Sequence, residues 1–254
     1  MTAALDLDTV SIRFGGVVAV DHVSCSISAS ELVGLIGPNG AGKTTLIRII
    51  AGLLAPDSGR ILISGIDVTN LSTAKRVRNG LAMTHQIVRP FRSMTVLENV
   101  TLAAGHRITA NPLRALLRWD RGMEEERSRE VLASVGLKGA ELKPVLALPL
   151  GQLKRLELAR ALAVDPSVIL LDEPLAGLNR REAAVQMDVI ASINARGVTT
   201  IVVEHNLAEV VRICPRVIVL DQGRIIADGP PNTVVADAAV REAYLGMGAS
   251  HAAA

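Results

Sequence analysis

The stretch GPNGAGKTT, residues 37 to 45, constrains the fold of this chain more than any other feature. It follows the apolar run ELVGLI and opens a helical pattern, which places it where a strand passes into a helix. Glycines let the backbone curl until successive amides face one point, and the helix N-terminus adds positive charge there. The spacing G-x-x-x-x-G-K-[ST] therefore predicts a phosphate-binding loop, whose members are Gly37, Pro38, Asn39, Gly40, Ala41, Gly42, Lys43, Thr44 and Thr45.

Two acidic residues end a second apolar run, VILLDE, at residues 168 to 173. Such a run indicates a buried strand, and the carboxyl ends of parallel strands form the ligand-binding edge of a sheet. We expect Thr44 to hold Mg²⁺ together with Asp172, which would act through water, while Lys43 reaches the β and γ phosphates. Glu173 is expected to orient or deprotonate the attacking water. The predicted cofactors are thus ATP and Mg²⁺, and the predicted reaction is ATP hydrolysis.

Two further polar residues end strand patterns. His205 follows the run TTIVVE, and an imidazole at that edge of a sheet can contact a γ-phosphate. Gln86 ends the run LAMTHQ, where its amide can contact Mg²⁺ or the attacking water. A lone histidine or glutamine at a strand end is more often a surface residue, so both assignments depend on the loop and the acids described above.

Strand and helix patterns alternate along much of the chain, which predicts βα units around a parallel sheet. The helices are expected to begin at Lys43, near Arg180 and at Asn206. The N-terminal runs DTVSIRF, VVAV and HVSCSIS alternate in polarity with no helix between them, and VIVLDQGRIIADG predicts a hairpin that turns at residues 221–223. A smaller antiparallel layer is therefore expected beside the parallel core.

Residues 87–162 differ from the rest, because strand patterns vanish there and helix signals accumulate. The pair Asn111 and Pro112 predicts one helix start, and Gly136 is a helix terminator. We expect a single domain of 254 residues, in which residues 1–86 and 163–254 form the α/β core and residues 87–162 form an inserted helical subdomain.

Composition and charge exclude several classes of protein. No apolar stretch approaches the roughly 18 to 20 residues of a membrane span, and residues 1–10 lack the pattern of a secretory signal, so we expect a cytosolic protein. A net charge of +2 without basic runs, and an aromatic content of 2%, argue against a nucleic-acid partner. Cys25 and Cys214 lie far apart without metal-ligand spacing and are expected to be reduced core thiols.

Together these motifs resemble the ATP-binding subunits of ABC transporters, in the order that this family shows and over nearly the whole chain. The resemblance implies a P-loop NTPase fold with a parallel-sheet core, a flanking antiparallel β layer and an inserted helical subdomain. By the same resemblance the functional segments are the Walker A loop at 37–45, the Q-loop at Gln86, the signature at 148–152, the Walker B strand at 168–173, the D-loop at Ala176, Gly177, Leu178 and Asn179, and the switch histidine His205.

The signature segment departs from the family pattern. The family sequence is LSGGQ, which binds the γ-phosphate of the nucleotide held by the partner subunit, whereas this chain has Leu148, Pro149, Leu150, Gly151 and Gln152. Proline removes a hydroxyl and an amide, and leucine replaces a flexible glycine. Proline still suits the first turn of a helix, and the amides of Gly151 and Gln152 are expected to point outward, where they can bind an anion. We expect an altered but functional signature, with a degenerate one as the alternative.

Other stretches resemble the larger of the two ATPases of branched-chain amino-acid importers: IRFGGVVAVDHVS, FRSMTVLENV, NPLRALLR, LAGLN and REAYLGMG. This resemblance implies a peripheral subunit at the cytoplasmic face of the inner membrane. Its partners would be two membrane permeases, a second ATP-binding subunit and a solute-binding protein, with the nucleotide-binding domains paired as a homodimer or heterodimer. Phe14 would stack on the adenine ring.

Other functions remain open from the sequence. One is an importer of urea, amides or another small polar solute. Another is a soluble ABC ATPase that serves an assembly machine, similar to iron–sulfur scaffold ATPases. A third, a non-catalytic nucleotide-binding regulator, is disfavoured because Glu173 and His205 are both present.

Overall fold

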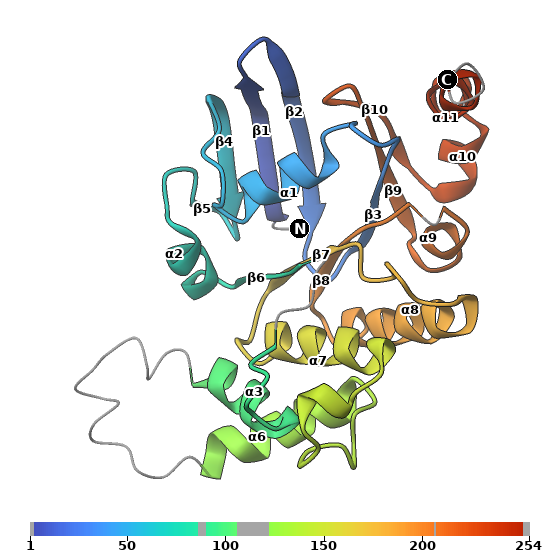
Figure 1. Ribbon diagram of the computed structural model, residues 1–254. Coiled ribbons are helices and arrows are strands. Elements are labelled where there is room, and N and C mark those ends of the chain that lie inside the picture. Colours follow the sequence, from blue (N-terminus) through green and yellow to red (C-terminus); the bar gives the residue numbers. More distant parts are fainter. Residues whose placement is uncertain (1–2, 86–89, 106–121, 206, 251–254) are drawn as a thin grey trace.

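The larger of two sheets forms the centre of the molecule (Figure 1). The computed structural model describes residues 3–85, 90–105, 122–205 and 207–250, with the backbone alone for 245–250. Within these residues the larger sheet has the strand order β10-β9-β3-β8-β7-β6, parallel except for the antiparallel pair β9 and β10. Its strands are β3 (Leu32–Ile36), β6 (Leu81–Thr84), β7 (Val168–Asp172), β8 (Thr199–Val203), β9 (Arg216–Asp221) and β10 (Arg224–Gly229). The predicted parallel core and the hairpin at 221–223 are confirmed.

The smaller sheet is antiparallel, in the order β2-β1-β4-β5, as the N-terminal patterns predict. Its strands are β1 (Ala3–Phe14), β2 (Val17–Ser28), β4 (Ser58–Ile63) and β5 (Ile66–Asp67). The runs VVAV and HVSCSIS form one continuous strand, β2, and not two. An irregularity at His22, whose φ is 50° and whose amide donates to Ser11 Oγ at 2.8 Å, lets the register shift while pairing continues.

Side-chain alternation along the parallel strands separates two hydrophobic layers. On β7, Val168 and Leu170 face a core formed with the smaller sheet and α1 (Lys43–Ile50), while Ile169 and Leu171 face a second core on the opposite side. All four side chains are fully buried. The parallel sheet is therefore covered on both faces, which explains why its strands are continuous apolar runs.

Helices cover the second core; the longer ones next to it lie in the lower part of Figure 1, and others lie on its right side. Near the sheet lie α7 (Leu150–Leu162), α8 (Arg180–Asn194) and α9 (Leu207–Ile213), and below them α3 (Val96–Ala104) and α6 (Gly122–Ser134). The remaining helical elements are α2 (Thr73–Arg78), the 3-10 turn η1 (Val145–Ala147), α10 (Pro231–Ala236) and α11 (Ala238–Ser250).

Two predicted helix starts are confirmed, at Lys43 and Arg180. The predicted start at Asn111 and Pro112 lies outside the described residues, as does Asn206, and α9 is described from Leu207. Helix α7 packs against α3 and α6 and also against β6, so it joins the helical layer to the parallel sheet.

The described residues also bear on the expectations about membrane spans and cysteines. In the part of the chain that the structure describes, no helix is long and apolar enough to cross a membrane. Both cysteines are free thiols; Cys214 is buried as predicted, whereas Cys25 is only partly buried. Burial raises the pKa of each thiol to about 12.

Candidate nucleotide-binding site

The predicted phosphate loop connects β3 to α1, and its shape requires glycine at two positions. Gly37 has a φ of 148°, and a Cβ atom there would lie 2.0 Å from the carbonyl oxygen of Leu220. Gly42 has a φ of 100°, and its Cβ would lie 2.3 Å from the carbonyl oxygen of Ala19. These carbonyl oxygens belong to β9 and β2 and cannot move aside, so only glycine fits at either position of the curled loop. This geometry fits a cradle for phosphate groups.

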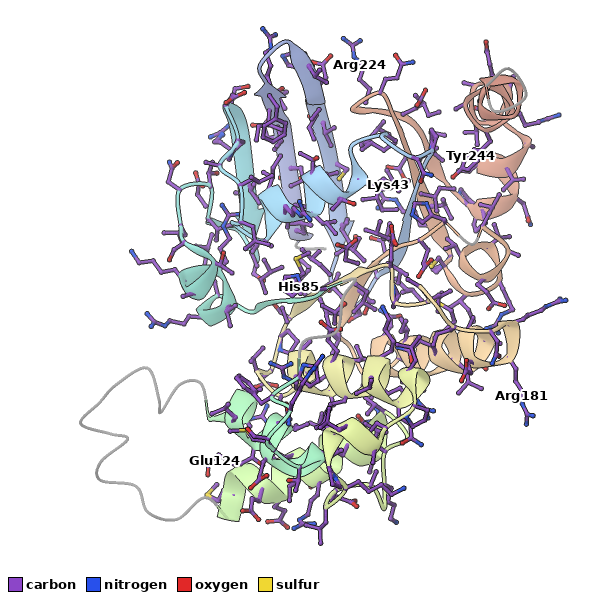
Figure 2. All side chains as sticks on the ribbon, viewed as in Figure 1. Lys43, His85, Glu124, Arg181, Arg224 and Tyr244 are labelled. Atoms are coloured by element: carbon purple, nitrogen blue, oxygen red, sulfur yellow. The ribbon has the colours of Figure 1, made fainter. Side chains whose placement is uncertain are left out.

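Lys43 occupies the inside of this loop (Figure 2). Its Nζ atom donates to the carbonyl oxygens of Gly37 at 2.7 Å and Pro38 at 2.8 Å, and the side chain is 4% exposed. Burial lowers the pKa of the amine, and the charges of Glu173 and Asp172 oppose that shift. The ammonium group is thus held by neutral carbonyls close to two acids, where phosphate oxygens would be stronger partners.

The two acids at the end of β7 differ in environment. Asp172 is 5% exposed, and its pKa is raised first by burial and then by the charge of Glu173. Glu173 adopts a φ of 47°, which is uncommon for a residue with a side chain, and its amide donates to Val203 O at 3.0 Å. The chain turns sharply here, so the two neighbouring carboxylates have different surroundings.

Glu173 contacts the predicted switch histidine. His205 Nε2 lies 2.6 Å from Glu173 Oε1, although the residues follow different strands. The side chain of Glu173 is 15% exposed and that of His205 is 44% exposed, so the pair lies at the surface edge of the sheet. The structure thus brings together a carboxylate and an imidazole that the sequence placed separately.

Thr44 and Asp172 offer the donor chemistry that Mg²⁺ prefers, a hydroxyl and a carboxylate. No group of three or more His, Cys, Asp or Glu side chains suited to a metal occurs among the residues that the structure describes. A phosphate-bound Mg²⁺ needs few protein ligands, because phosphate and water oxygens supply the rest. Gln86, the third predicted Mg²⁺ contact, lies outside the described residues.

The signature segment lies at the start of α7. Leu148 is buried, Pro149 is the N-cap residue, and Leu150 is the first helical residue. Pro149 therefore precedes the first turn, in contrast to the prediction. The expected outward amide of Gln152 is also wrong, because it donates to Pro149 O at 2.9 Å and tightens the turn.

The predicted D-loop runs beside this helix start. A Cβ atom on Gly177 would lie 2.9 Å from Leu150 Cδ2, so the two segments touch. Asn179 ends the D-loop as the N-cap of α8, in a reciprocal capping box with Glu182. Ala176 and Leu178 are partly buried.

Phe14, the predicted adenine contact, lies apart from the signature and D-loop segments. It is 48% exposed at the end of β1, where its ring is available for stacking.

A cavity of about 540 Å³ opens beside residues 38–41, and Asp221, Gln222 and Glu242 line its other side. None of its lining residues comes from the signature segment, so the signature does not complete this part of the same chain's loop.

Three features near the candidate site were not predicted from the sequence. Glu204, 4% exposed, accepts from Leu175 N at 2.6 Å and from His205 N at 3.2 Å, which ties the two acidic strand ends together. Lys154 and Glu157 on α7 contact the same strand edge and are treated below. Tyr244 lies on α11, and burial raises the pKa of its hydroxyl (Figure 2). The sequence signal for Glu204 was a charge at the end of an apolar run, and for Glu157 a charge on the apolar face of a helix.

Comparison with known proteins agrees with this geometry. The chain matches the ABC transporter family over residues 20–176. It belongs to that family. Residues 224–246, which form β10 and the helices after it, match the branched-chain amino acid ATP-binding cassette transporter family. The chain is therefore an ATP-binding subunit of the branched-chain amino-acid transporter type, an ATPase that hydrolyses ATP for transport.

Relatives cover this ABC ATPase almost completely. It is 35% identical to the high-affinity branched-chain amino acid transport ATP-binding protein LivG of Escherichia coli K12, over 95% of this chain and 97% of LivG. It is 34% identical to BraF of Pseudomonas aeruginosa with the same coverage. It is also 36% identical to the lipopolysaccharide export ATP-binding protein LptB of Acidithiobacillus ferridurans, over 90% and 91% of the two chains.

A solved structure supports the fold directly. The ABC ATPase superimposes on the ADP conformation of MJ1267, an ATP-binding cassette of an ABC transporter, with a TM-score of 0.85 and 31% identity. The match covers 97% of this chain and 100% of the other. The predicted fold class is confirmed.

Proposed function

We propose that this ABC ATPase couples ATP hydrolysis to the uptake of branched-chain or similar amino acids. The observation that carries the solute class is the family match at residues 224–246, since over nearly the whole chain the identity is 35% to LivG and 36% to the export protein LptB. Part of this segment lies beside the phosphate loop, because Ile226, Ala239 and Glu242 line one cavity with residues 38–41. The proposal places this segment within the energy-coupling subunit of an importer.

In the proposed mechanism the loop amides of residues 37–45 and Lys43 bind the phosphates of ATP. Lys43 exchanges its two carbonyl partners for phosphate oxygens, which are charged and bind an ammonium more strongly. The open position of Gly40, where a Cβ would meet nothing within 4 Å, supports an approach of the ligand from that side. Phe14 stacks on the adenine ring.

Thr44, Asp172 and Gln86 would hold Mg²⁺, which neutralises charge on the β and γ phosphates when it is bound. Glu173 orients the attacking water and accepts its proton at the carboxylate. His205, which already contacts Glu173, would leave this carboxylate to contact the γ-phosphate.

We further propose that two nucleotide-binding domains pair, so that Leu148, Pro149, Leu150, Gly151 and Gln152 of one complete the site of the other. The cavity beside residues 38–41 lacks these residues from its own chain, which supports completion by a second domain. The site formed with Pro149 and Leu150 would be the slower of two unequal sites. The partners would be two permeases, a second ATPase and a solute-binding protein, at the cytoplasmic face of the inner membrane.

The division of the domain belongs to the same proposal. Residues 1–86 and 163–254 would form the core, and residues 87–162 a helical subdomain that contacts the permeases. The mutual packing of α3, α6 and α7 supports such a unit, although α7 also packs on β6.

The second candidate function is transport of a different cargo, and the similarity to LptB is the observation in its favour.

The two candidate functions are distinguished by reconstitution of the complex that co-purifies with this chain from its native membranes. Proteoliposomes that contain ATP and receive the transporter's solute-binding protein should accumulate radiolabelled leucine, isoleucine or valine, with ATP hydrolysis rising in parallel. Accumulation of urea or an amide instead would move the solute class. Purification of the chain without any permease would contradict the importer assignment. Stimulation of its ATP hydrolysis by lipid without a solute would contradict it as well.

A further inference from the structure

Helix α7 carries two charged side chains, Lys154 and Glu157, that are almost fully buried. They are 5% and 8% exposed. Their spacing of three residues places them on one face of the helix, and α7 packs on β6. Lysine and glutamate are rarely buried unless each has a partner, because the loss of hydration is costly. Their partners therefore indicate what this face of the helix does.

Each side chain binds a backbone atom that adjoins the proposed catalytic residues. Glu157 Oε1 accepts a hydrogen bond from the amide of His85 at 2.9 Å, and His85 immediately precedes Gln86. Lys154 Nζ donates to the carbonyl oxygen of Glu173 at 3.2 Å. Figure 2 places His85 at the end of β6, next to α7. One helix face thus holds two separate strand ends, 72 and 19 residues away in the sequence.

The charge of Lys154 fits this position. Its amine is close enough to Glu157, Glu204, Glu173 and Asp172 for their charges to act on it, although burial lowers its pKa. Burial conversely raises the pKa of Glu157, and Lys154 counteracts that shift. The lysine is a positive charge from α7 among the acids at the strand edge, and it compensates charges that would otherwise repel each other.

We propose that Lys154 and Glu157 are positioning residues, which fix the peptide of Glu173 and the backbone leading to Gln86 to the helix that begins at the signature segment. Lys154 lies four residues after Leu150, about 6 Å along the helix axis. The proposed function places this helix start at the partner's nucleotide, so binding there would be transmitted through α7 to the chain's own water-orienting carboxylate. The inference rests on the proposed roles of Gln86 and Glu173.

The test is the ATPase kinetics of the assembled transporter, together with ATP binding by the full-length chain. Glu157→Leu removes the acceptor for the His85 amide, whereas Glu157→Gln keeps an acceptor oxygen of the same reach. We expect kcat to fall about tenfold or more for Glu157→Leu and about threefold or less for Glu157→Gln, with KM and nucleotide affinity within about twofold. Lys154→Met should reproduce the kcat loss.

Gln186→Met is the matched control. Gln186 comes from α8, is 3% exposed and lines the same small cavity as Lys154 and Glu157. Its Oε1 atom has no hydrogen-bond partner among the described residues, so this variant perturbs packing without releasing either strand end. Its kcat should stay within about twofold of the native value.

An unchanged kcat for Glu157→Leu would overturn the inference. A fall in kcat for Glu157→Leu would also overturn it if nucleotide affinity and thermal stability fell equally. In that case Gln186→Met would show the same losses, and Glu157→Gln would not restore kcat. Glu173→Gln separates failure of the proposed function from failure of the positioning inference. If Glu173→Gln retains turnover, the assigned role of Glu173 fails. If it abolishes turnover while Glu157→Leu and Lys154→Met behave natively, only the positioning inference fails.

Discussion

His205 Nε2 and Glu173 Oε1 lie 2.6 Å apart, and this contact joins the carboxyl ends of β8 and β7. The sharp turn at Glu173, with its φ of 47°, directs the chain away from the strand at this point. A carboxylate beside an imidazole at a parallel sheet edge, next to a phosphate loop, is an arrangement that can orient a water molecule. The proposed hydrolysis uses both residues, Glu173 at the attacking water and His205 at the γ-phosphate.

His205→Ala should lower ATP turnover by about 100-fold, because it removes the imidazole proposed to contact the γ-phosphate. ATP affinity should stay nearly native, since the phosphate loop is untouched. Single-turnover hydrolysis and equilibrium binding measure the two effects. His22→Ala is the control, because His22 also pairs with a carboxylate, that of Asp21, on the exposed surface. Equal turnover in both variants would refute the role of His205.

Gly37→Ala should lower nucleotide affinity by about 100-fold or more, because the new Cβ would meet the Leu220 carbonyl oxygen at 2.0 Å at a φ of 148°. The loop would have to move away from β9, and its amides would no longer face the phosphates. Isothermal titration with ATP measures the loss. Gly16→Ala, where a Cβ meets nothing within 4 Å, should bind ATP normally. Native affinity in Gly37→Ala would show that the loop does not cradle phosphate.

Arg76→Met should reduce the free energy of unfolding by about 3 to 5 kcal/mol. Arg76 is 1% exposed and donates to the carbonyl oxygens of Ile49, Ile50, Leu71 and Thr69, two of them at the end of α1. The variant leaves these acceptors buried without a donor. Denaturant unfolding checks the value.

The control for this prediction is Arg60→Met, which breaks an exposed ion pair with Asp8. An exposed pair contributes only about 0 to 1 kcal/mol, so this variant should unfold almost as the native chain does. A similar small loss for Arg76→Met would contradict the proposed support of α1.

The local features of the fold could be predicted from the sequence, because neighbouring residues determine them. The strand and helix on either side of Lys43, the continuous apolar strand before Asp172 and the turn before Arg224 all follow from periodicity and turn residues. The bulge at His22 could not be predicted, since it depends on how β2 pairs with β1.

The site was predictable only in part. Its residues were identified by motif, but the contacts of Glu157 with His85 and of Glu204 with Leu175 span 72 and 29 positions and join a side chain to a backbone atom. No sequence pattern marks a backbone partner. The available signals were Glu204, at the end of an apolar run, and Glu157, which interrupts the apolar face of a helix; a buried charge in either place requires a partner.

Pro149→Ser should raise transporter ATPase activity or leave it within about twofold. Pro149 is the N-cap residue of α7, a position where serine can accept a hydrogen bond from the first turn and can also donate its hydroxyl to phosphate. Steady-state hydrolysis by the assembled complex is the measurement. A fall of about tenfold or more would show that the proline is adapted to this signature, and would remove the argument for a slower site.

Uptake of radiolabelled leucine by proteoliposomes that contain the complete transporter with Glu173→Gln in this chain is the most direct test of the account. Glutamine keeps the size of the side chain but cannot accept the proton of the attacking water. We predict that the variant complex assembles and binds ATP normally, while uptake and hydrolysis both fall to the background of ATP-free vesicles. Uptake at the native rate would contradict the claim that ATP hydrolysis at Glu173 drives transport.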